Sequence, residues 1–388
     1  MIDKKEKSLV VIQLSGGNDA MNTLVPYTNG IYHDSRSAIH LTEDKIIDID
    51  GSLGFHPEMG EIKKLWDQNK VAVINGIGYP VPNRSHFRSM DIWHTAEPDK
   101  VGTEGWLGRV IREIDPKGEN PVTAVNIGQG LPRALVAPNV SVASVADVET
   151  YGLLTSVEEE KVREKMLTRF SNMYGAALGS GPVMDYLGQT GIDALNGAEI
   201  LKVAPEKYES TIEYGNSQIA QNLRDVASVH KAGLGTRVFY TQQGSYDTHA
   251  TQAPAFSKLW TELAAAIQNF WDDLKISGDD ENVVMFLFSE FGRRVRDNGS
   301  GTDHGAAGVS FVIGPAVKGG MYSRYPETRA EALEQGDLVP NQDFRGVYST
   351  ILENWLEVEA APIVNGTFSS ENFFIFYSRF VVHGVWVH

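Results

Sequence analysis

The chain of 388 residues contains no cysteine, which excludes disulfide bonds, thiolate nucleophiles and cysteine-ligated zinc sites. Positive charge is also scarce, because 34 Lys and Arg stand against 50 Asp and Glu, for a formal net charge of −16. Phosphate backbones and anionic membranes repel such a chain, so we expect no nucleic-acid partner. An anionic substrate stays compatible with this charge, because a bound cation can reverse the local field.

Long hydrophobic runs are missing as well. No stretch approaches the ~20 apolar residues of a membrane helix, and the nearest one, 373–387, contains Arg379 and His383. We therefore expect no membrane span. The first seven residues, MIDKKEK, lack the apolar core of a signal peptide. The sequence as written predicts a cytoplasmic protein, unless a leader has been removed.

Six short apolar runs alternate with helical patterns along the chain. They lie at residues 8–14, 70–76, 122–127, 235–241, 282–288 and 309–313. Such runs indicate buried parallel strands, and a parallel sheet has helices on both faces. The length and a hydrophobic content of 42% allow a large core. We predict a single α/β domain over 1–388, built as a three-layer αβα sandwich with a mostly parallel sheet.

Helical periodicity is clearest at 255–276, and residues 57–68 show a shorter version of it. Two charged stretches, 157–178 and 207–231, also look helical. They lie within 128–233, which we interpret as a helical insertion beside the sheet. An insertion could wall or cover a site at the strand ends, whereas ordinary outer-layer helices are the alternative.

The C-terminal tail, residues 370–388, is unusually aromatic. An exposed apolar segment of this length would promote association. We predict that the tail either packs as a core strand or joins two copies of the chain into a homo-oligomer.

Polar residues follow several predicted strands, at the carboxyl ends where open α/β sheets bind ligands. Carboxylates and imidazoles gathered there from distant segments are what a divalent-metal site needs. We predict that six residues converge within one site: Asp19, Ser85, Asp247, His249, Glu290 and His304. All of them except Ser85 are candidate ligands of a divalent metal, and Asp303 is a further candidate.

Each member of this set also has an ordinary structural interpretation. Asp19 could cap the next helix. Asp247 and His249 could form a simple hydrogen-bonded pair, and Glu290 could form a surface salt bridge with Arg293 or Arg294.

A second motif surrounds Ser85, in the segment 81–91 (VPNRSHFRSMD), where a helix is expected to begin. As an N-cap, Ser85 would satisfy a free backbone N–H. As a nucleophile, it would gain from the helix dipole, and the same N–H groups would hold an anion. Arg84, His86 and Arg88 could hold a phosphate or sulfate group beside it.

The motifs resemble a known family. The segments 14–19 (LSGGND), 83–95 (NRSHFRSMDIWHT), 246–249 (YDTH), 289–293 (SEFGR) and 301–305 (GTDHG) look like the bacterial family called domain of unknown function 1501. This family is more distantly similar to the alkaline phosphatase superfamily, which includes sulfatases and cofactor-independent phosphoglycerate mutases. The resemblance covers about residues 8–356 and implies an alkaline-phosphatase-like fold. Many members carry a twin-arginine leader, so it also implies a periplasmic or exported location.

The resemblance implies roles for individual residues. In the superfamily, an Asp metal ligand follows the first strand, and Asp19 matches it. A Ser, Thr or modified Cys nucleophile begins the helix after the second strand, and Ser85 matches it. An Asp and a His four residues later follow, but here Asp247 and His249 lie only two apart.

In the last part of the superfamily pattern, this chain departs further from it. Glu290 and Phe291 stand where an Asp-His pair is usual, and phenylalanine cannot bind a metal. His304 with Gly305 matches the final His, or else Asp303 and His304 are themselves the Asp-His pair. The resemblance therefore implies one ion (Zn, Ca, Mg or Mn), or none, rather than two.

Together these observations predict a metal-dependent hydrolase or transferase acting on phosphate or sulfate esters of a small molecule or a glycan. Ser85 would attack the ester. Arg84 or Arg88 would bind its non-bridging oxygens, and His86 or His249 would protonate the leaving group. The alternative is a degenerate, non-catalytic protein of the same fold that binds a carbohydrate, glycan or protein partner.

Overall fold

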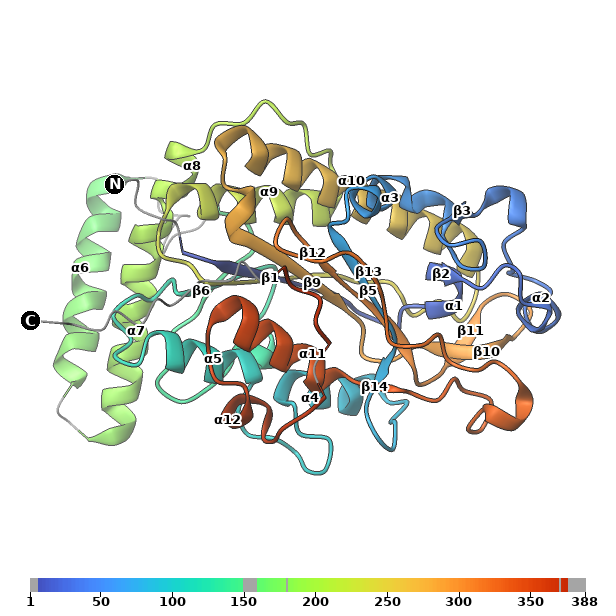
Figure 1. The fold of residues 1–388 in the computed structure, drawn as a ribbon. Coiled ribbons are helices and arrows are strands. Elements are labelled where there is room, and N and C mark those ends of the chain that lie inside the picture. The colour runs from blue at the N-terminus through green and yellow to red at the C-terminus, as the bar shows by residue number, and fades with distance from the viewer. Residues whose placement is uncertain (1–5, 149–158, 179–180, 370, 376–388) are drawn as a thin grey trace, which may run out of the picture.

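A computed structural model describes residues 6–148, 159–178, 181–369 and 371–375 (Figure 1). Its centre is a nine-stranded sheet in the order β13-β5-β12-β9-β1-β8-β6-β7, with β14 beside β5. β12 runs antiparallel to both neighbours, and the other pairings in this sheet are parallel. The strands are β1 (Ser8–Leu14), β5 (Val71–Gly78), β6 (Ala124–Ile127), β7 (Ala143–Val145), β8 (Val238–Gln243), β9 (Val283–Phe288), β12 (Gly308–Ile313), β13 (Gly320–Tyr322) and β14 (Gln342–Asp343).

Burial on both faces explains the continuous apolar character of the central strands. All seven residues of β1 are buried. Val10 and Ile12 belong to one hydrophobic cluster, whereas Leu9 and Val11 belong to the other, because successive side chains of a strand point to opposite faces. Each of these side chains removes apolar area from water, worth roughly 25 cal/mol per Å².

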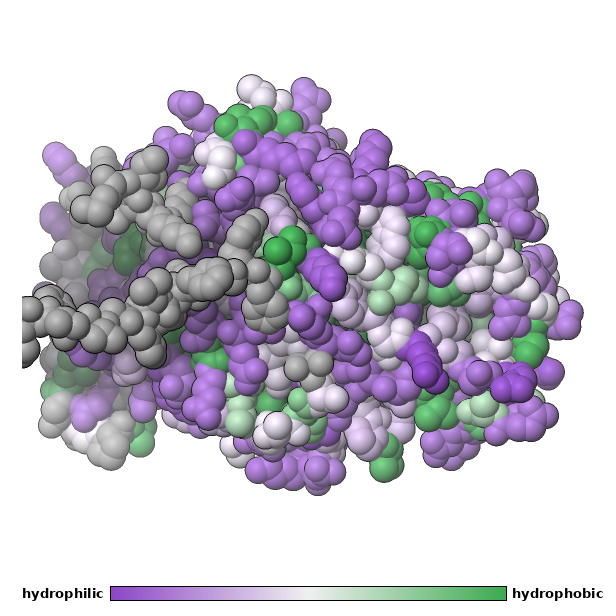
Figure 2. Space-filling view, viewed as in Figure 1, coloured by the Kyte–Doolittle hydropathy of each residue, from purple (hydrophilic) through white to green (hydrophobic). Residues whose placement is uncertain are grey.

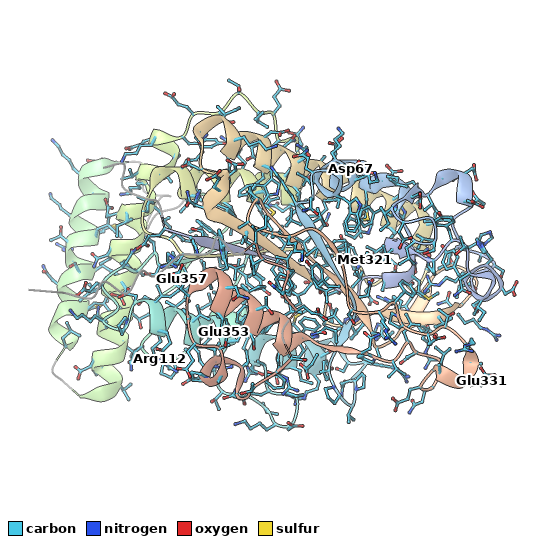
Figure 3. All side chains as sticks on the ribbon, in the orientation of Figure 1. Asp67, Arg112, Met321, Glu331, Glu353 and Glu357 are labelled. Carbon is cyan, nitrogen blue, oxygen red and sulfur yellow. The ribbon has the colours of Figure 1, made fainter. Side chains whose placement is uncertain are left out.

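Helices cover the two faces of the sheet (Figure 1), and side chains fill the space between the layers (Figure 3). One layer contains α3 (Gly60–Asp67), α9 (Gln218–Ala232) and α10 (Gln252–Ser277), whose buried residues join the first cluster. The other contains α4 (His86–Thr95), α5 (Trp106–Ile114), α11 (Phe344–Ile351), a π-helical turn (Leu352–Leu356) and α12 (Ala361–Val364). The three-layer αβα sandwich with a mostly parallel sheet is therefore confirmed.

Two smaller sheets and several short helices lie outside the central sheet. A three-stranded sheet has the order β2-β4-β3, and β10 pairs with β11. Two short helices also follow β1. The bounds of these strands and helices are α1 (Ala20–Thr23), β2 (Leu24–Val25), α2 (Gly30–Ser35), β3 (Ile47–Asp48), β4 (Gly54–Phe55), β10 (Arg293–Asp297) and β11 (Thr302–His304). Single 3-10 turns span Glu43–Lys45, Pro57–Met59, Arg133–Leu135, Asp280–Asn282 and Ala330–Ala332.

The region 128–233 is helical but not wholly so. It contains β7 and the helices α6 (Glu160–Ala177), α7 (Pro182–Leu201), α8 (Val203–Lys207) and α9. α6 and α7 lie against each other at the left of Figure 1. α9 buries Leu223 and Val226 in the first cluster and is an outer-layer helix of the sandwich, as the alternative interpretation has it.

The predicted helix 207–231 was wrong in its first half. α9 begins only at Gln218, because the preceding segment is held in another conformation by the buried carboxylate of Asp273. Tyr208 and Ser210 donate hydrogen bonds of 2.7 Å to it, and Tyr214 donates one of 3.0 Å. A continuous helix would turn Tyr208 and Ser210 to nearly opposite sides.

The C-terminal tail is described only as far as residue 375. Phe373 and Phe374 are buried in the second cluster, and Phe374 forms an isolated antiparallel bridge with Val317. Residues 370 and 376–388, on which the predicted oligomer interface mainly depends, lie outside the described residues. Among the described helices, none combines the length and hydropathy that crossing a bilayer requires. Hydrophilic residues dominate the face in Figure 2.

Candidate functional site

The carboxyl ends of β1, β5, β8 and β9 meet at one edge of the sheet, toward the right of Figure 1. Two glycines let the loop after β1 pass close to its neighbours. Gly16 has φ +122°, and a Cβ there would lie 2.3 Å from the backbone N of Asp247. Gly17 has φ +79°, and a Cβ there would lie 2.4 Å from the ring of Phe291. Only glycine fits both the backbone and the space.

A group of imidazoles and carboxylates lies at this edge. His86, Asp247 and His304 each offer one donor atom, and these atoms lie within 4.8 Å of one another. His304 Nε2 is 3.1 Å from Asp247 Oδ1, and His86 Nε2 is 3.5 Å from Asp247 Oδ2. His249 Nε2 is 2.9 Å from His304 Nε2 and 3.1 Å from Asp247 Oδ1. We call these four residues the His/Asp cluster.

The other ring nitrogen of each histidine meets an oxygen atom. His86 Nδ1 lies 2.8 Å from Glu290 Oε1, and His249 Nδ1 lies 3.2 Å from Asp303 Oδ1. His304 Nδ1 lies 2.8 Å from the backbone oxygen of Arg84. Glu290 and Asp303 therefore contact histidine rings rather than facing the centre of the cluster.

Arg293 ties the loops around the cluster together. Its buried guanidinium donates hydrogen bonds to the backbone oxygens of residues 16, 17, 246 and 302. It also donates a hydrogen bond of 2.8 Å to Asp247 Oδ1. The sequence suggested only a surface salt bridge here. Burial alone would raise the pKa of Asp247, but the hydrogen bond and the positive charge of Arg293 oppose it, and the pKa is lowered to about 2. Asp247 is thus a carboxylate at neutral pH.

Phe291 fills the space behind the cluster. Its ring centroid lies 4.9 Å from that of His86 and 4.8 Å from that of His304. The side chain is buried. The residue that replaces a histidine of the superfamily pattern therefore packs against two cluster imidazoles and limits their movement.

Among the described contacts, Asp19 makes none with the His/Asp cluster. Its buried carboxylate forms an ion pair with the buried guanidinium of Arg36. It accepts a hydrogen bond of 2.5 Å from Gln252 Nε2, and it caps α1 by accepting a hydrogen bond from the amide of Met21. These contacts engage both carboxylate oxygens, and the ligand role of Asp19 stays a prediction. Asp19 performs the capping role that the sequence offered as its alternative.

Ser85 is the exposed N-cap residue of α4, and within the described chain its hydroxyl makes no capping hydrogen bond. The two neighbouring arginines have other partners. Arg84 Nε donates 2.7 Å to Asp337 Oδ2, and Arg88 Nη1 donates 2.6 Å to Asp91 Oδ2. Both guanidinium groups are thus paired with carboxylates, and their role in holding an anion stays a prediction.

A pocket of about 510 Å³ opens beside the cluster. Its lining includes Gln13, Ser15, His86, Phe87, Ser245 and Asp247. Phe87, at the start of α4, is 91% exposed. On the pocket wall, Gln13 Oε1 accepts 2.9 Å from His94 Nε2, and burial lowers the pKa of His94 to about 4, so this imidazole is neutral at pH 7. The pocket thus combines an exposed aromatic ring and uncharged polar groups with the charged side chains of Asp91, Arg133, Asp247 and Glu290.

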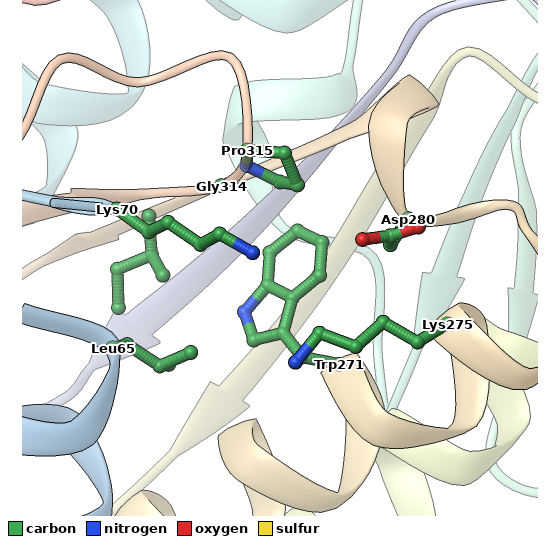
Figure 4. A pocket seen from close by; sticks show the side chains of 8 residues that line it. Leu65, Lys70, Trp271, Lys275, Asp280, Gly314 and Pro315 are labelled. Atoms are coloured by element: carbon green, nitrogen blue, oxygen red, sulfur yellow. The ribbon is translucent and has the colours of Figure 1, made fainter. Parts of the chain in front are cut away.

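Another hollow, shown in Figure 4, lies near the opposite edge of the sheet, where Lys70 precedes β5 and Pro315 follows β12. Trp271 and Lys275 of α10 close it from one side. It leaves no room for a water molecule. The pocket beside the His/Asp cluster is therefore the better candidate for a ligand.

Sequence reasoning found most of these residues but missed two roles. The sequence predicts that His86 holds an anion or protonates the leaving group, and the structure places it near Asp247, as it does His304. Arg293 was treated as a surface group, although it is buried. The signal for His86 was its place directly after Ser85 at the helix start.

The fold and the cluster define an α/β sandwich protein with a candidate metal centre at its strand ends. Residues 194–354 match the family described as "Protein of unknown function (DUF1501)", which confirms the resemblance seen in the motifs. The matched region includes Asp247, His249 and His304. Ser85 and His86 lie before it. None of the curated proteins matches the chain.

Solved structures of similar fold include three with low identity. A protein in the alkaline phosphatase superfamily from Vibrio parahaemolyticus is 9% identical, with a TM-score of 0.39, over 83% of this chain and 64% of that one. The C-terminal periplasmic domain of EcEptC from Escherichia coli, in complex with Zn, is 8% identical, with a TM-score of 0.36, over 80% and 73%. PsFucS1 sulfatase from Pseudoalteromonas sp. is 11% identical, with a TM-score of 0.40, over 95% and 71%.

Proposed function

We propose that the protein is a metal-dependent hydrolase of phosphate or sulfate esters that acts at the His/Asp cluster. One observation carries the proposal. His86 Nε2 is buried and has no hydrogen-bond partner among the described residues, although it faces the carboxylate of Asp247 from 3.5 Å. A buried polar atom without a partner is costly. A divalent cation fits this donor set, because imidazole and carboxylate are common metal ligands.

When bound, such a cation would screen charge that develops on the ester oxygens. Ser85 is the proposed nucleophile. Its hydroxyl oxygen would bond to phosphorus or sulfur while the bond to the leaving alcohol breaks. Ser85 is exposed, so solvent can take its proton and return one to the alcohol oxygen. Water then hydrolyses the seryl ester, and the free N–H groups at the start of α4 would hold the anion.

Removal of metal tests this function. Purified protein should hydrolyse 4-nitrophenyl phosphate or 4-nitrophenyl sulfate, lose the activity after EDTA and gel filtration, and regain it with one of Zn²⁺, Mn²⁺, Mg²⁺ or Ca²⁺. Release of 4-nitrophenol is followed by absorbance. Hydrolysis of neither ester with any of the four ions would overturn the proposal.

The pocket indicates what the rest of the substrate would contact. Phe87 offers an exposed aromatic face at its rim, and Gln13 and Ser15 offer uncharged hydrogen-bonding groups. One face of a sugar ring is more apolar than the other and would contact Phe87, and the hydroxyl groups at its rim would contact the polar groups. A glycan ester would therefore match both parts of the pocket. We therefore propose a small-molecule or glycan ester as the substrate class.

Replacing Phe87 by alanine should raise KM for glucose 6-phosphate or glucose 6-sulfate about tenfold, because about 1.4 kcal/mol of ring contact is lost. The value of kcat should change little. Val101→Ala is the matched control, because Val101 is also exposed but does not line the pocket. An equal KM in the Phe87→Ala and Val101→Ala variants would show that the ring does not contact substrate.

A non-catalytic binding protein is the second candidate, and one observation favours it. Arg133 is the arginine that lines the described pocket, and its Nη1 pairs with Asp91 Oδ1 at 2.6 Å. An anionic ester would therefore depend on the metal and the helix N-terminus for its charge. Binding of a neutral glycan without hydrolysis of either nitrophenyl ester would support this candidate.

A further inference from the structure

We infer that the His/Asp cluster is a four-donor centre, with Nε2 of His86, His249 and His304 and a carboxylate oxygen of Asp247, which selects a transition metal of the zinc type over Mg²⁺ and Ca²⁺. The inference rests on the proposed function for its metal dependence. It goes beyond that proposal by assigning a ligand atom to each of the four residues and by naming the class of ion.

The first step concerns the histidine tautomers, which follow from the partners of each ring. His304 Nδ1 faces the backbone oxygen of Arg84 at 2.8 Å, and a carbonyl oxygen only accepts hydrogen bonds. In the neutral imidazole, Nδ1 then carries the hydrogen, which leaves the lone pair on Nε2. The same holds for His249, whose Nδ1 faces Asp303, and for His86, whose Nδ1 faces Glu290.

The second step is where the lone pairs point. His249 Nε2 and His304 Nε2 lie 2.9 Å apart, and each lies 3.1 Å from Asp247 Oδ1. With these tautomers, no hydrogen is available between the three acceptors. Acceptors this close repel one another unless a positive charge lies among them. Arg293 contributes a positive charge through its hydrogen bond of 2.8 Å to Asp247 Oδ1. In the described contacts, it touches neither imidazole.

The third step is the identity of the ion. Three of the four donors are nitrogen atoms, which suit Zn, Cu, Fe and Ni, whereas Mg²⁺ and Ca²⁺ prefer oxygen ligands. Histidine ligands commonly donate their other N–H to a carboxylate or a backbone carbonyl. Glu290, Asp303 and the carbonyl of Arg84 match this pattern, so Glu290 and Asp303 position ligands rather than bind the ion.

Cobalt(II) provides a readout that needs no enzymatic activity. The full chain, freed of metal with EDTA, is titrated with Co²⁺, and the visible d–d absorption of the bound ion is recorded. We expect a saturable spectrum that stoichiometric Zn²⁺ abolishes and that a hundredfold excess of Mg²⁺ or Ca²⁺ leaves in place. No Co²⁺ spectrum, or equal competition by Mg²⁺ or Ca²⁺, would overturn the inference.

Two variants test the individual roles. His249→Ala removes a proposed ligand and should weaken Co²⁺ binding at least tenfold and change the shape of the spectrum. Asp303→Ala removes only the partner of the His249 ring and should weaken binding about 10- to 100-fold with the shape retained. Both side chains are about half exposed, which favours folding, and near-UV circular dichroism verifies it.

His33→Ala is the control, since the His33 ring contacts Tyr32 and His40 rather than the cluster. Unchanged Co²⁺ affinity in His249→Ala would remove His249 from the centre and overturn the four-donor assignment. The outcome for the proposed function is separate. A Co²⁺ spectrum without ester hydrolysis would reject the hydrolase and keep the centre, whereas hydrolysis that requires Mg²⁺ or Ca²⁺ would do the reverse.

Discussion

Ser85→Ala should lower kcat/KM for 4-nitrophenyl phosphate or sulfate by about 10³-fold or more, because a covalent route cannot proceed without its nucleophile. Stability should hardly change. The hydroxyl of Ser85 makes no capping hydrogen bond in the described chain, so the usual cost of about 1 kcal/mol for losing a cap does not apply. Initial rates and urea unfolding of the same preparations give the two values.

Ser277→Ala is the matched control for Ser85, because Ser277 is also an exposed serine but does not line the pocket. It should keep most of the activity. If Ser85→Ala keeps its rate while metal removal still abolishes hydrolysis, Ser85 is not the nucleophile but the metal-dependent function stands.

Asp19→Asn should lower the free energy of unfolding by about 3–5 kcal/mol, the range for removing one partner of a buried ion pair. Asp19 and Arg36 are both fully buried, and asparagine keeps the shape but leaves the guanidinium charge without its counterion. Burial lowers the pKa of Arg36, but Asp19 outweighs burial and raises it, so Arg36 stays charged. Urea unfolding measures the change.

Two companion variants sharpen this measurement. Asp44→Asn removes an exposed carboxylate and should change stability by less than about 0.5 kcal/mol. Asp19→Asn with Arg36→Met removes both charges and should recover part of the loss. Unchanged stability of Asp19→Asn together with lost Co²⁺ binding would instead restore Asp19 as a metal ligand.

The strands of the sheet could be predicted because their period and burial are local properties of the sequence. The run 8–14 is mostly apolar, and the structure buries it from both sides. Strand direction is not local. Nothing in 309–313 shows that β12 runs antiparallel, because direction depends on how the chain returns to the sheet. The break before Gln218 likewise depends on Asp273, which lies in another helix.

The candidate site was predictable in position but not in detail. Asp247 and Glu290 follow the apolar runs 235–241 and 282–288, so their place at the strand ends could be read directly, whereas His304 lies in β11 of the small β10-β11 sheet. The fate of Asp19 depends on Arg36, an arginine that no motif marks, because burial of a charge pair is decided by tertiary packing. Whether Glu290 binds an ion or a histidine ring depends on differences of a few ångströms, which sequence spacing does not encode.

The cluster is assembled from distant parts of the chain, and this has a consequence for the order of events during biogenesis. His86 contacts Glu290 across 204 residues, and Asp247 contacts His304 across 57. Contacts of such sequence separation form late and slowly, since the entropy of closing long loops must be overcome first. Zinc fingers gather their ligands from one short segment and fold around the ion. Here the polypeptide must close its central sheet before any ion can be captured, so metallation would be a final maturation step rather than a nucleus for folding.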